Sequence, residues 1–230
     1  MDWTPIAFEG KHVVEIGCGP LGGFGPMAIF CGAEIFESAE PEWDPNLMFD
    51  PAVVEKYLRV FHADLTALYG ERVNFNSFLE LLEKRMRITR TGFESAAIPR
   101  TVDIVLSQSV LEHVFPLEDT IRKLSEIQSS DTQFLHLVDF GNHYPTAHPF
   151  EGLYDAPADD YIAKRGKAIN CLRMSDLASA FEEASIAARF VPSRVVDIPY
   201  PGRVHSWWQD KYEAQDLATQ LCLIAGPTND

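Results

Sequence analysis

Short apolar runs alternate along this chain with segments whose apolar residues recur at the spacing of a helix. A short apolar run bounded by turn residues predicts a strand, and apolar residues three and four positions apart predict a helix. Strands are expected over 11–16, 34–38, 87–91, 102–107 and 134–139. Helices are expected over 24–31, 50–68, 77–85 and 117–128. This order is typical of an α/β fold with a doubly wound, mostly parallel sheet and helices on both faces.

Residues that commonly cap helices stand at the predicted helix ends. Gly32 follows the first helix and is expected to stop it. Asp50 before Pro51 indicates an N-cap with proline at the first helical position. The chain is expected to close with a helix over 176–184 capped by Ser175 and with apolar segments over 189–197 and 217–225.

Two long connections interrupt the alternation of strands and helices. At 230 residues the chain is expected to form a single domain, 1–230. Residues 40–84 exceed what one crossover needs and predict a helical insertion, either packed on the edge of the core or acting as a substrate cap. Residues 141–172 follow the carboxyl end of a strand, where open α/β sheets bind ligands, and predict a lid over a substrate.

Charge and composition exclude several classes of partner. The 34 acidic residues outnumber the 19 basic ones and give a formal charge of −15, which repels a nucleic-acid backbone. The four cysteines have no metal-binding or disulfide spacing, so reduced thiols are expected. No apolar run is long enough for a membrane span, and no signal peptide is apparent. We therefore expect a soluble, cytoplasmic protein that binds neither nucleic acid nor a membrane.

A glycine-rich turn, GCGPLG over 17–22, follows the first predicted strand. Glycines in a turn between a strand and a helix allow a nucleotide cofactor to approach the backbone. The pattern fits a dinucleotide such as NAD, and Glu37 has the spacing of a ribose-binding acid. Glu15, however, lies inside the strand, where a buried carboxylate needs a donor. The ammonium group of S-adenosylmethionine is such a donor, which favours this cofactor over NAD.

A more specific motif follows the glycine turn. The segment VDIVLSQSVLEHV over 102–114 resembles the fourth-strand signature of class I S-adenosylmethionine-dependent methyltransferases. The closing order of strand, helix and strands is similar to the same family, and the resemblance covers residues 11–225. It implies a seven-stranded sheet whose last strand is antiparallel, and S-adenosylmethionine as methyl donor.

The resemblance also implies roles for individual residues. Gly17, Cys18 and Gly19 would lie with Glu15 beside the methionine part of the cofactor. The acid on the ribose would be Glu37 or Glu40, although Glu37 also fits a solvated surface acid. The remaining cofactor contacts would be Phe93 and Glu94 at the adenine and Ser107 and Gln108 near the reacting methyl group.

One position departs from the family pattern. Many members carry an aspartate after the third strand, where this chain has Thr91, Gly92, Phe93 and Glu94. Glu94 is the nearest substitute for it, and Phe93 fits an ordinary core residue as well as an adenine platform.

Methyl transfer requires a base for the proton of the acceptor. His143 is the first candidate because it follows a strand end together with Asp139. His113, in the LEH motif, fits a structural or cofactor-adjacent role, and His148 is a further candidate. Some related signatures read ExxEH and bind a divalent metal. Ser109 replaces the first glutamate here, so no metal is expected, although Glu112 and His113 with a later histidine remain an alternative.

The sequence thus predicts methyl transfer to an oxygen or nitrogen atom of a small, neutral or cationic metabolite. Aromatic and histidine side chains of the second connection and the C-terminal part are expected to line its pocket or to pack in the core: Tyr144, His148, Phe150, Tyr154, Trp207 and Trp208. The alternative is a methyltransferase-like binding or regulatory protein without activity, and an NAD-dependent dehydrogenase is less favoured.

Overall fold

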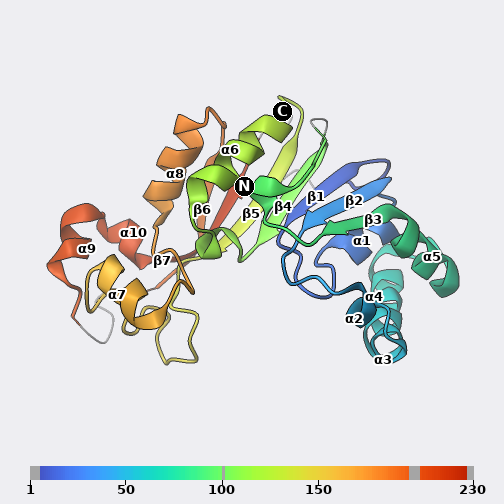
Figure 1. The fold of residues 1–230 in the computed structure, drawn as a ribbon, viewed down its shortest axis with the longest axis horizontal. Helices are drawn as coiled ribbons and strands as arrows, with labels where there is room; N and C mark the ends of the chain where they lie inside the picture. The colour runs from blue at the N-terminus through green and yellow to red at the C-terminus, as the bar shows by residue number, and fades with distance from the viewer. Residues whose placement is uncertain (1–5, 100–101, 197–202, 227–230) are drawn as a thin grey trace. The chain divides into compact units, whose positions relative to one another are not determined.

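The computed structural model describes residues 6–99, 102–196 and 203–226. Its strands form one seven-stranded sheet in the order β3-β2-β1-β4-β5-β7-β6 (Figure 1). The strands are β1 (His12–Ile16), β2 (Ile35–Ala39), β3 (Met86–Thr89), β4 (Ile104–Gln108), β5 (Gln133–Asp139), β6 (Arg189–Val195) and β7 (Thr219–Ala225). Strand β7 runs antiparallel to both β5 and β6. The predicted seven-stranded α/β sheet with an antiparallel last strand is confirmed.

The chain divides into two compact units, which we describe separately. The first contains Met1–Ser107 and Glu126–Phe134, within the described residues. Its strands β1, β2, β3 and β4 pair in parallel. Its helices are α1 (Gly25–Phe30), α2 (Pro45–Met48), α3 (Pro51–Val53), the π-helical turn η1 (Val54–Leu58), α4 (Arg59–Tyr69), α5 (Phe75–Arg85) and the 3-10 turn η2 (Phe93–Ser95).

The end of α1 illustrates how local sequence sets the fold of this unit. Gly32 has φ +94° and its N–H donates to the Ile29 carbonyl, while the N–H of Ala33 donates to the Ala28 carbonyl. These two bonds are those of a Schellman motif, which satisfies the last carbonyls of a helix and requires a left-handed residue. The predicted stop at Gly32 is confirmed, and it turns the chain directly into β2.

The predicted insertion 40–84 is helical. Asp50 caps α3 by accepting the N–H of Ala52 at 2.8 Å, and Pro51 occupies the first helical position, as predicted. The helix continues through η1 into α4 and ends at Tyr69, one residue beyond the prediction. Helix α5 buries Phe78 and Leu82, and the Phe78 ring meets Phe30 of α1 edge to face. Whether this segment also covers a substrate stays a prediction.

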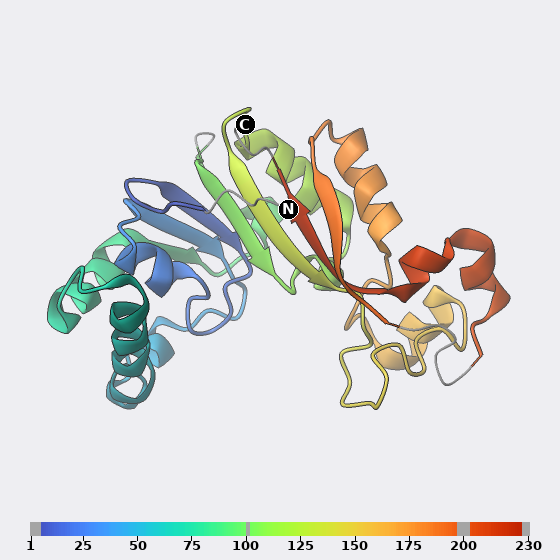
Figure 2. The ribbon, with the colours of Figure 1, turned by 180° about the vertical axis from the view of Figure 1, so that it is seen from behind.

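The second unit contains Gln108–Ser125 and Leu135–Pro227, within the described residues. Its helices are the 3-10 turn η3 (Leu111–His113), α6 (Leu117–Ile127), α7 (Ala158–Arg165), α8 (Met174–Glu183), α9 (Ser206–Lys211) and α10 (Ala214–Ala218). Helices α6 and α8 lie on the same face of β5, β7 and β6 (Figures 1 and 2). Strand β5 alternates between buried and half-buried side chains, which fits a strand covered unequally on its two faces.

A separate hydrophobic cluster forms beside the strands of this second unit. Phe150, Tyr154 and Trp208 are fully buried in this cluster, and Tyr161 of α7 also belongs to it. These aromatic side chains pack mainly against one another, with ring centroids 5.0 Å apart for Phe150 and Tyr154 and 4.9 Å apart for Tyr154 and Trp208. Much of the predicted lid 141–172 is therefore anchored by its own core, and its role as a lid stays a prediction.

Several predicted boundaries differ from the structure by a few residues, and three of them lie in the C-terminal part of the chain. Helix α8 begins at Met174 with Arg173 as N-cap, not at a cap on Ser175, because the carboxylate of Asp176 accepts the N–H of Arg173 at 2.8 Å. The apolar segment 217–225 is a strand only from Thr219, since its first two residues end α10. Strand β6 ends at Val195, and position 197 of the predicted segment lies outside the described residues.

Two further expectations concern thiols and membranes. The four cysteines are free thiols, as expected. Among the helices of the described ranges, none has the length and apolar character needed to cross a bilayer.

Candidate functional site

The glycine turn after β1 lies in the first unit, at the edge formed by the carboxyl ends of β1, β2 and β4. The register places Glu15 beside Ser38 and beside Leu106, so the residues that follow these strands share one edge. Gly17 and Gly19 have φ of +68° and +63°, which side chains rarely tolerate. A Cβ added at Gly19 would meet no atom within 4 Å. Gly19 thus exposes its backbone to open space at the edge where α/β sheets bind ligands.

Glu15 supports the turn from inside the first unit. Its side chain is almost fully buried, and its Oε2 accepts the N–H of Phe24 at 2.8 Å. A Cβ added at Gly23 would lie 2.4 Å from the same carboxylate oxygen, so glycine is required there. Burial raises the pKa of Glu15 to about 8, and the nearby Glu40 carboxylate contributes to this rise. A cationic group beside Glu15 would offset the cost of its ionised form.

Glu40 approaches the turn from the end of β2. Its Oε2 accepts the N–H of Gly19 at 2.8 Å, and its Oε1 accepts the N–H of Glu42 at 2.9 Å. Two carboxylates, Glu15 and Glu40, therefore converge on one glycine turn. This arrangement favours a ligand that carries positive charge and hydroxyl donors.

Glu37 lies inside β2, two residues before the end of the strand. Its carboxylate lies 2.8 Å from Nε2 of His12, at the start of β1, and 3.8 Å from Arg87. The glycine turn follows the opposite, carboxyl end of β1. Glu40 therefore lies beside the turn and Glu37 does not, and β2 ends one residue later than predicted. Which of the two acids contacts a ribose stays a prediction.

The other predicted cofactor residues differ in exposure. Ser107 is buried and Gln108 exposed at the end of β4. Phe93 is buried in η2, as a core residue would be, whereas Glu94 is exposed and its carboxylate folds over Gly92. Burial raises the pKa of Cys18 to about 12, so it remains a neutral thiol. Any adenine contact from Phe93 or Glu94 stays a prediction.

A second group of polar side chains lies in the second unit, around the end of β5. Nε2 of His143 lies 3.1 Å from the Asp139 carbonyl and 3.7 Å from Oε1 of Glu112. The rings of His113 and His143 meet edge to face with centroids 4.7 Å apart. Glu112 is buried, and its Oε1 accepts the N–H of Asp139 at 3.1 Å. The three residues predicted to act in catalysis, His143, His113 and Asp139, are therefore brought together.

Burial sets the protonation of this group. It raises the pKa of Glu112 to about 8, partly opposed by N–H donors and reinforced by the Asp139 carboxylate. It also lowers the pKa of His113, while the Ala168 carbonyl that binds Nδ1 acts in the opposite direction. Because a carbonyl only accepts, Nδ1 of His113 carries its proton and Nε2 is left as an acceptor.

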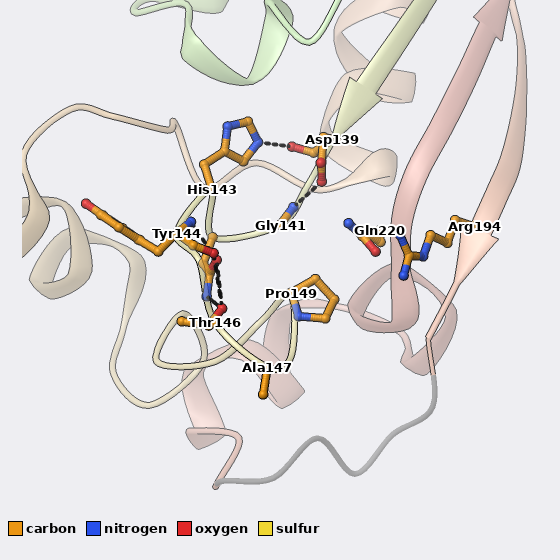
Figure 3. A pocket seen from close by; sticks show the side chains of 10 residues that line it. Asp139, Gly141, His143, Tyr144, Thr146, Ala147, Pro149, Arg194 and Gln220 are labelled. Carbon is orange, nitrogen blue, oxygen red and sulfur yellow. Dashed lines mark hydrogen bonds between the residues drawn. The ribbon is translucent and has the colours of Figure 1, made fainter.

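A cavity of about 270 Å³ adjoins this group within the second unit (Figure 3). Asp139 and His143 lie on one side of it, and Arg194 and Gln220 reach it from β6 and β7. Its loop is fixed by Asn142, whose side-chain amide donates to Thr146 and to the Glu151 carbonyl and accepts the N–H of Tyr144. Neither Arg194 nor Gln220 belongs to a local motif, so sequence reasoning missed both.

The predicted substrate residues separate into packing and surface positions. Phe150 belongs to the buried cluster, and Trp207 packs edge to face on Trp208 at 4.8 Å. Nδ1 of His148 accepts the N–H of Phe150, which fits a role in shaping the loop. Tyr144 lines the cavity and is 38 % exposed, and the guanidinium of Arg165 lies over its ring. Of these residues, Tyr144 has the position most suited to contact a substrate.

No protein-family model matches the sequence. No curated protein sequence matches it either.

Solved structures match over almost the whole chain. A S-adenosylmethionine-dependent methyltransferase from Mesorhizobium loti is 15% identical with a TM-score of 0.54, over 97% of this chain and 94% of that one. A protein from Listeria monocytogenes, provisionally assigned to the same class, is 12% identical with a TM-score of 0.53, over 98% and 94% of the two chains.

A third solved structure is the phosphoethanolamine N-methyltransferase 2 of Haemonchus contortus in complex with S-adenosyl-L-methionine. It is 12% identical with a TM-score of 0.55, over 98% of this chain and 50% of that one. The fold of this protein is therefore the Rossmann-like fold of class I methyltransferases.

Proposed function

We propose that this protein binds S-adenosylmethionine at the glycine turn and transfers its methyl group to an oxygen or nitrogen atom of a small molecule. The observation that carries the proposal is the pair of carboxylates, Glu15 and Glu40, at a turn whose Gly19 exposes open backbone. The LEH motif and the methyltransferase fold support the same cofactor.

The residues around the glycine turn and at the end of β4 fit this ligand. The ammonium group of the methionine part would lie near Glu15, where it offsets the cost of a buried carboxylate. The ribose hydroxyls would donate to Glu40, which we prefer to Glu37 because its carboxylate already lies at the glycine turn. Gly17 and Gly19 would allow close approach, and Ser107 and Gln108 would border the methyl group.

When bound, S-adenosylmethionine supplies a methyl group already activated by a sulfonium sulfur. The chain itself needs only to align the acceptor and to remove its proton. We assign the second task to the group formed by His143, His113 and Asp139. Nε2 of His143 donates to the Asp139 carbonyl, which leaves Nδ1 able to take a proton. The acceptor would occupy the adjoining cavity, with Tyr144 and Arg194 as contacts.

A turnover assay tests this proposal. Purified protein would be incubated with S-adenosylmethionine carrying a labelled methyl group and with a panel of small alcohols, phenols and amines. We expect label in at least one acceptor and stoichiometric S-adenosylhomocysteine. Cofactor binding without transfer to any acceptor would support the alternative, a methyltransferase-like binding protein, and NADH binding in its place would support a dehydrogenase.

A further inference from the structure

Glu112, His113 and His143 each offer one ligand atom, and these atoms all lie within 4.8 Å of one another. Two of the residues come from η3 and the third from the loop after β5, so the fold and not a local motif assembles them. We propose that these three side chains form a binding site for a divalent transition-metal ion, with Zn²⁺ as the expected occupant.

One oxygen of the Glu112 carboxylate is buried and unpaired within the described residues. Glu112 is 2 % exposed, and its Oε2 has no hydrogen-bond partner within the part of the chain that the structure describes. A buried carboxylate oxygen without a donor is costly, and buried charges in proteins are usually paired or coordinate a metal. A cation bound by this carboxylate would remove that cost.

Backbone carbonyls hold both imidazole rings of the cluster. Each histidine has one ring nitrogen on a backbone carbonyl: His113 on Ala168 and His143 on Asp139. Such a bond fixes the tautomer and leaves the other ring nitrogen unprotonated, which is the form that binds a metal. Metal-binding histidines usually have an outer hydrogen bond of this kind.

The ligand atoms of the three side chains lie somewhat farther apart than they would around a bound ion. Two ligands at about 2.0–2.1 Å from a tetrahedral zinc ion lie roughly 3.3 Å apart. Nε2 of His143 lies 3.7 Å from Oε1 of Glu112, which brings the two side chains together, and the ion would bind Nδ1 of the same ring because Nε2 donates to the Asp139 carbonyl. The three ligand atoms lie within 4.8 Å of one another, so an ion bound to all three would require side-chain shifts of roughly an ångström or more. His143 and Glu112 are joined through Asp139, which limits how far they can separate.

The ligand types select the ion. Two imidazoles with one carboxylate suit Zn²⁺, Co²⁺ or Fe²⁺, whereas Mg²⁺ and Ca²⁺ prefer oxygen ligands. Three protein ligands leave a position for water or for an acceptor hydroxyl, as in catalytic zinc sites. With the ion bound, His143 acts as a ligand and no longer as a free base. The site shares His113 and His143 with the proposed proton-accepting group, but ion binding can be measured without methyl transfer.

A titration of the metal alone tests the site. Protein without a histidine tag, stripped with a chelator, would be titrated with Zn²⁺ in a calorimeter, and the Co²⁺ form would be examined by visible absorption. We expect one equivalent to bind and the d–d bands of a low-coordinate cobalt site. Glu112→Gln, His113→Gln and His143→Gln should each weaken binding roughly tenfold or more. An excess of Mg²⁺ should not compete.

His148→Gln is the matched control, because His148 belongs to the same loop but not to the cluster. It should bind Zn²⁺ like the wild type and show the same rise in Tm on adding the ion. If Glu112→Gln fails to fold, His113→Gln and His143→Gln still test the site. Both replace partly exposed side chains, so these variants are expected to fold. Absence of stoichiometric binding, or equal affinity in His113→Gln, His143→Gln and His148→Gln, would overturn the proposal. These readouts need no cofactor, so failure of methyl transfer leaves them unaffected.

Discussion

The N–H of Gly19 donates to Oε2 of Glu40 at 2.8 Å, which joins the tip of the glycine turn to the residue that follows β2. This bond holds a carboxylate at the turn, where a ribose would need an acceptor for its hydroxyl protons. Glu37, three residues earlier, holds its carboxylate at His12 instead. The two acids therefore have separable roles.

Glu40→Gln should weaken S-adenosylmethionine binding. A hydrogen bond to a charged group is worth about 1.5–3 kcal/mol, so the loss should be roughly 10- to 100-fold in Kd. Calorimetric titration measures it. The matched variant Glu37→Gln should leave Kd unchanged and lower the Tm, because Glu37 pairs with His12. If Glu37→Gln weakens binding more than Glu40→Gln, the assignment of the ribose acid is reversed.

Glu15 should make the stability of the cofactor-free protein depend on pH. Its pKa is about 8 in the folded state, above the ordinary value of 4.5 for a glutamate. The folded state thus holds a proton that the unfolded state has lost, and the free energy of unfolding should fall as pH rises from about 4.5 to about 8.

Urea denaturation of the wild type and of Glu15→Gln near pH 6 and above pH 8 measures this dependence. Glu112 contributes a dependence of the same sign to both proteins, so the difference between them isolates Glu15. Glu15→Gln should lose less stability over this range. Equal losses in the two proteins would show that Glu15 is not held protonated.

Binding of the cofactor should release a proton near pH 7. An ammonium group beside Glu15 favours its ionised form and lowers its pKa, so the proton leaves on binding. Calorimetry in buffers of different ionisation enthalpy counts that proton. Glu15→Gln should abolish the release, and an unchanged proton count in this variant would place the cationic group elsewhere.

Tyr154→Phe should destabilise the protein without removing a substrate contact. The Tyr154 hydroxyl donates to the Leu217 carbonyl at 2.9 Å and accepts from Arg173 at 3.1 Å, in the buried cluster. Removing it leaves buried polar groups unpaired, at a cost of about 1–3 kcal/mol in the free energy of unfolding.

The exposed Tyr144 provides the comparison for Tyr154. Tyr144→Phe should change stability by less than about 0.5 kcal/mol. Denaturation curves and turnover measured on both variants separate the two roles. Loss of turnover in Tyr154→Phe at unchanged stability would instead make Tyr154 a substrate residue.

Elements set by local signals could be predicted from the sequence. Gly32 and the Asp50–Pro51 pair end and begin helices through their own backbone geometry, and apolar runs such as that of β4 leave no alternative to a buried strand. The cap of α8 was missed because Arg173 is an unusual N-cap and the deciding acceptor is Asp176, inside the helix.

Only those residues of the candidate site that belong to one short segment of the chain could be predicted from the sequence. The glycine turn, Glu15 and the LEH motif were found, since each is local. The choice between Glu37 and Glu40 depended on a strand end that periodicity places only to within about two to four residues. Arg194 and Gln220 reach the cavity from β6 and β7, and the approach of His143 to Glu112 depends on the fold. Tertiary contacts of this kind leave no pattern in a single sequence.

Gly19→Ala tests the central claim, that the glycine turn is the methyl-donor site, and Gly10→Ala is its control. Gly10 has φ +68° against +63° at Gly19, and an added Cβ meets no atom within 4 Å at either residue. Both variants should therefore share a backbone cost of about 1–2 kcal/mol. Only the Gly19 methyl group would enter the proposed cofactor site.

The most direct measurement is calorimetric titration of the wild type and these two variants with S-adenosylmethionine. We predict one site per chain, unchanged affinity in Gly10→Ala and at least a tenfold loss in Gly19→Ala. Absence of binding to the wild type, or the same affinity in both variants, would contradict the account.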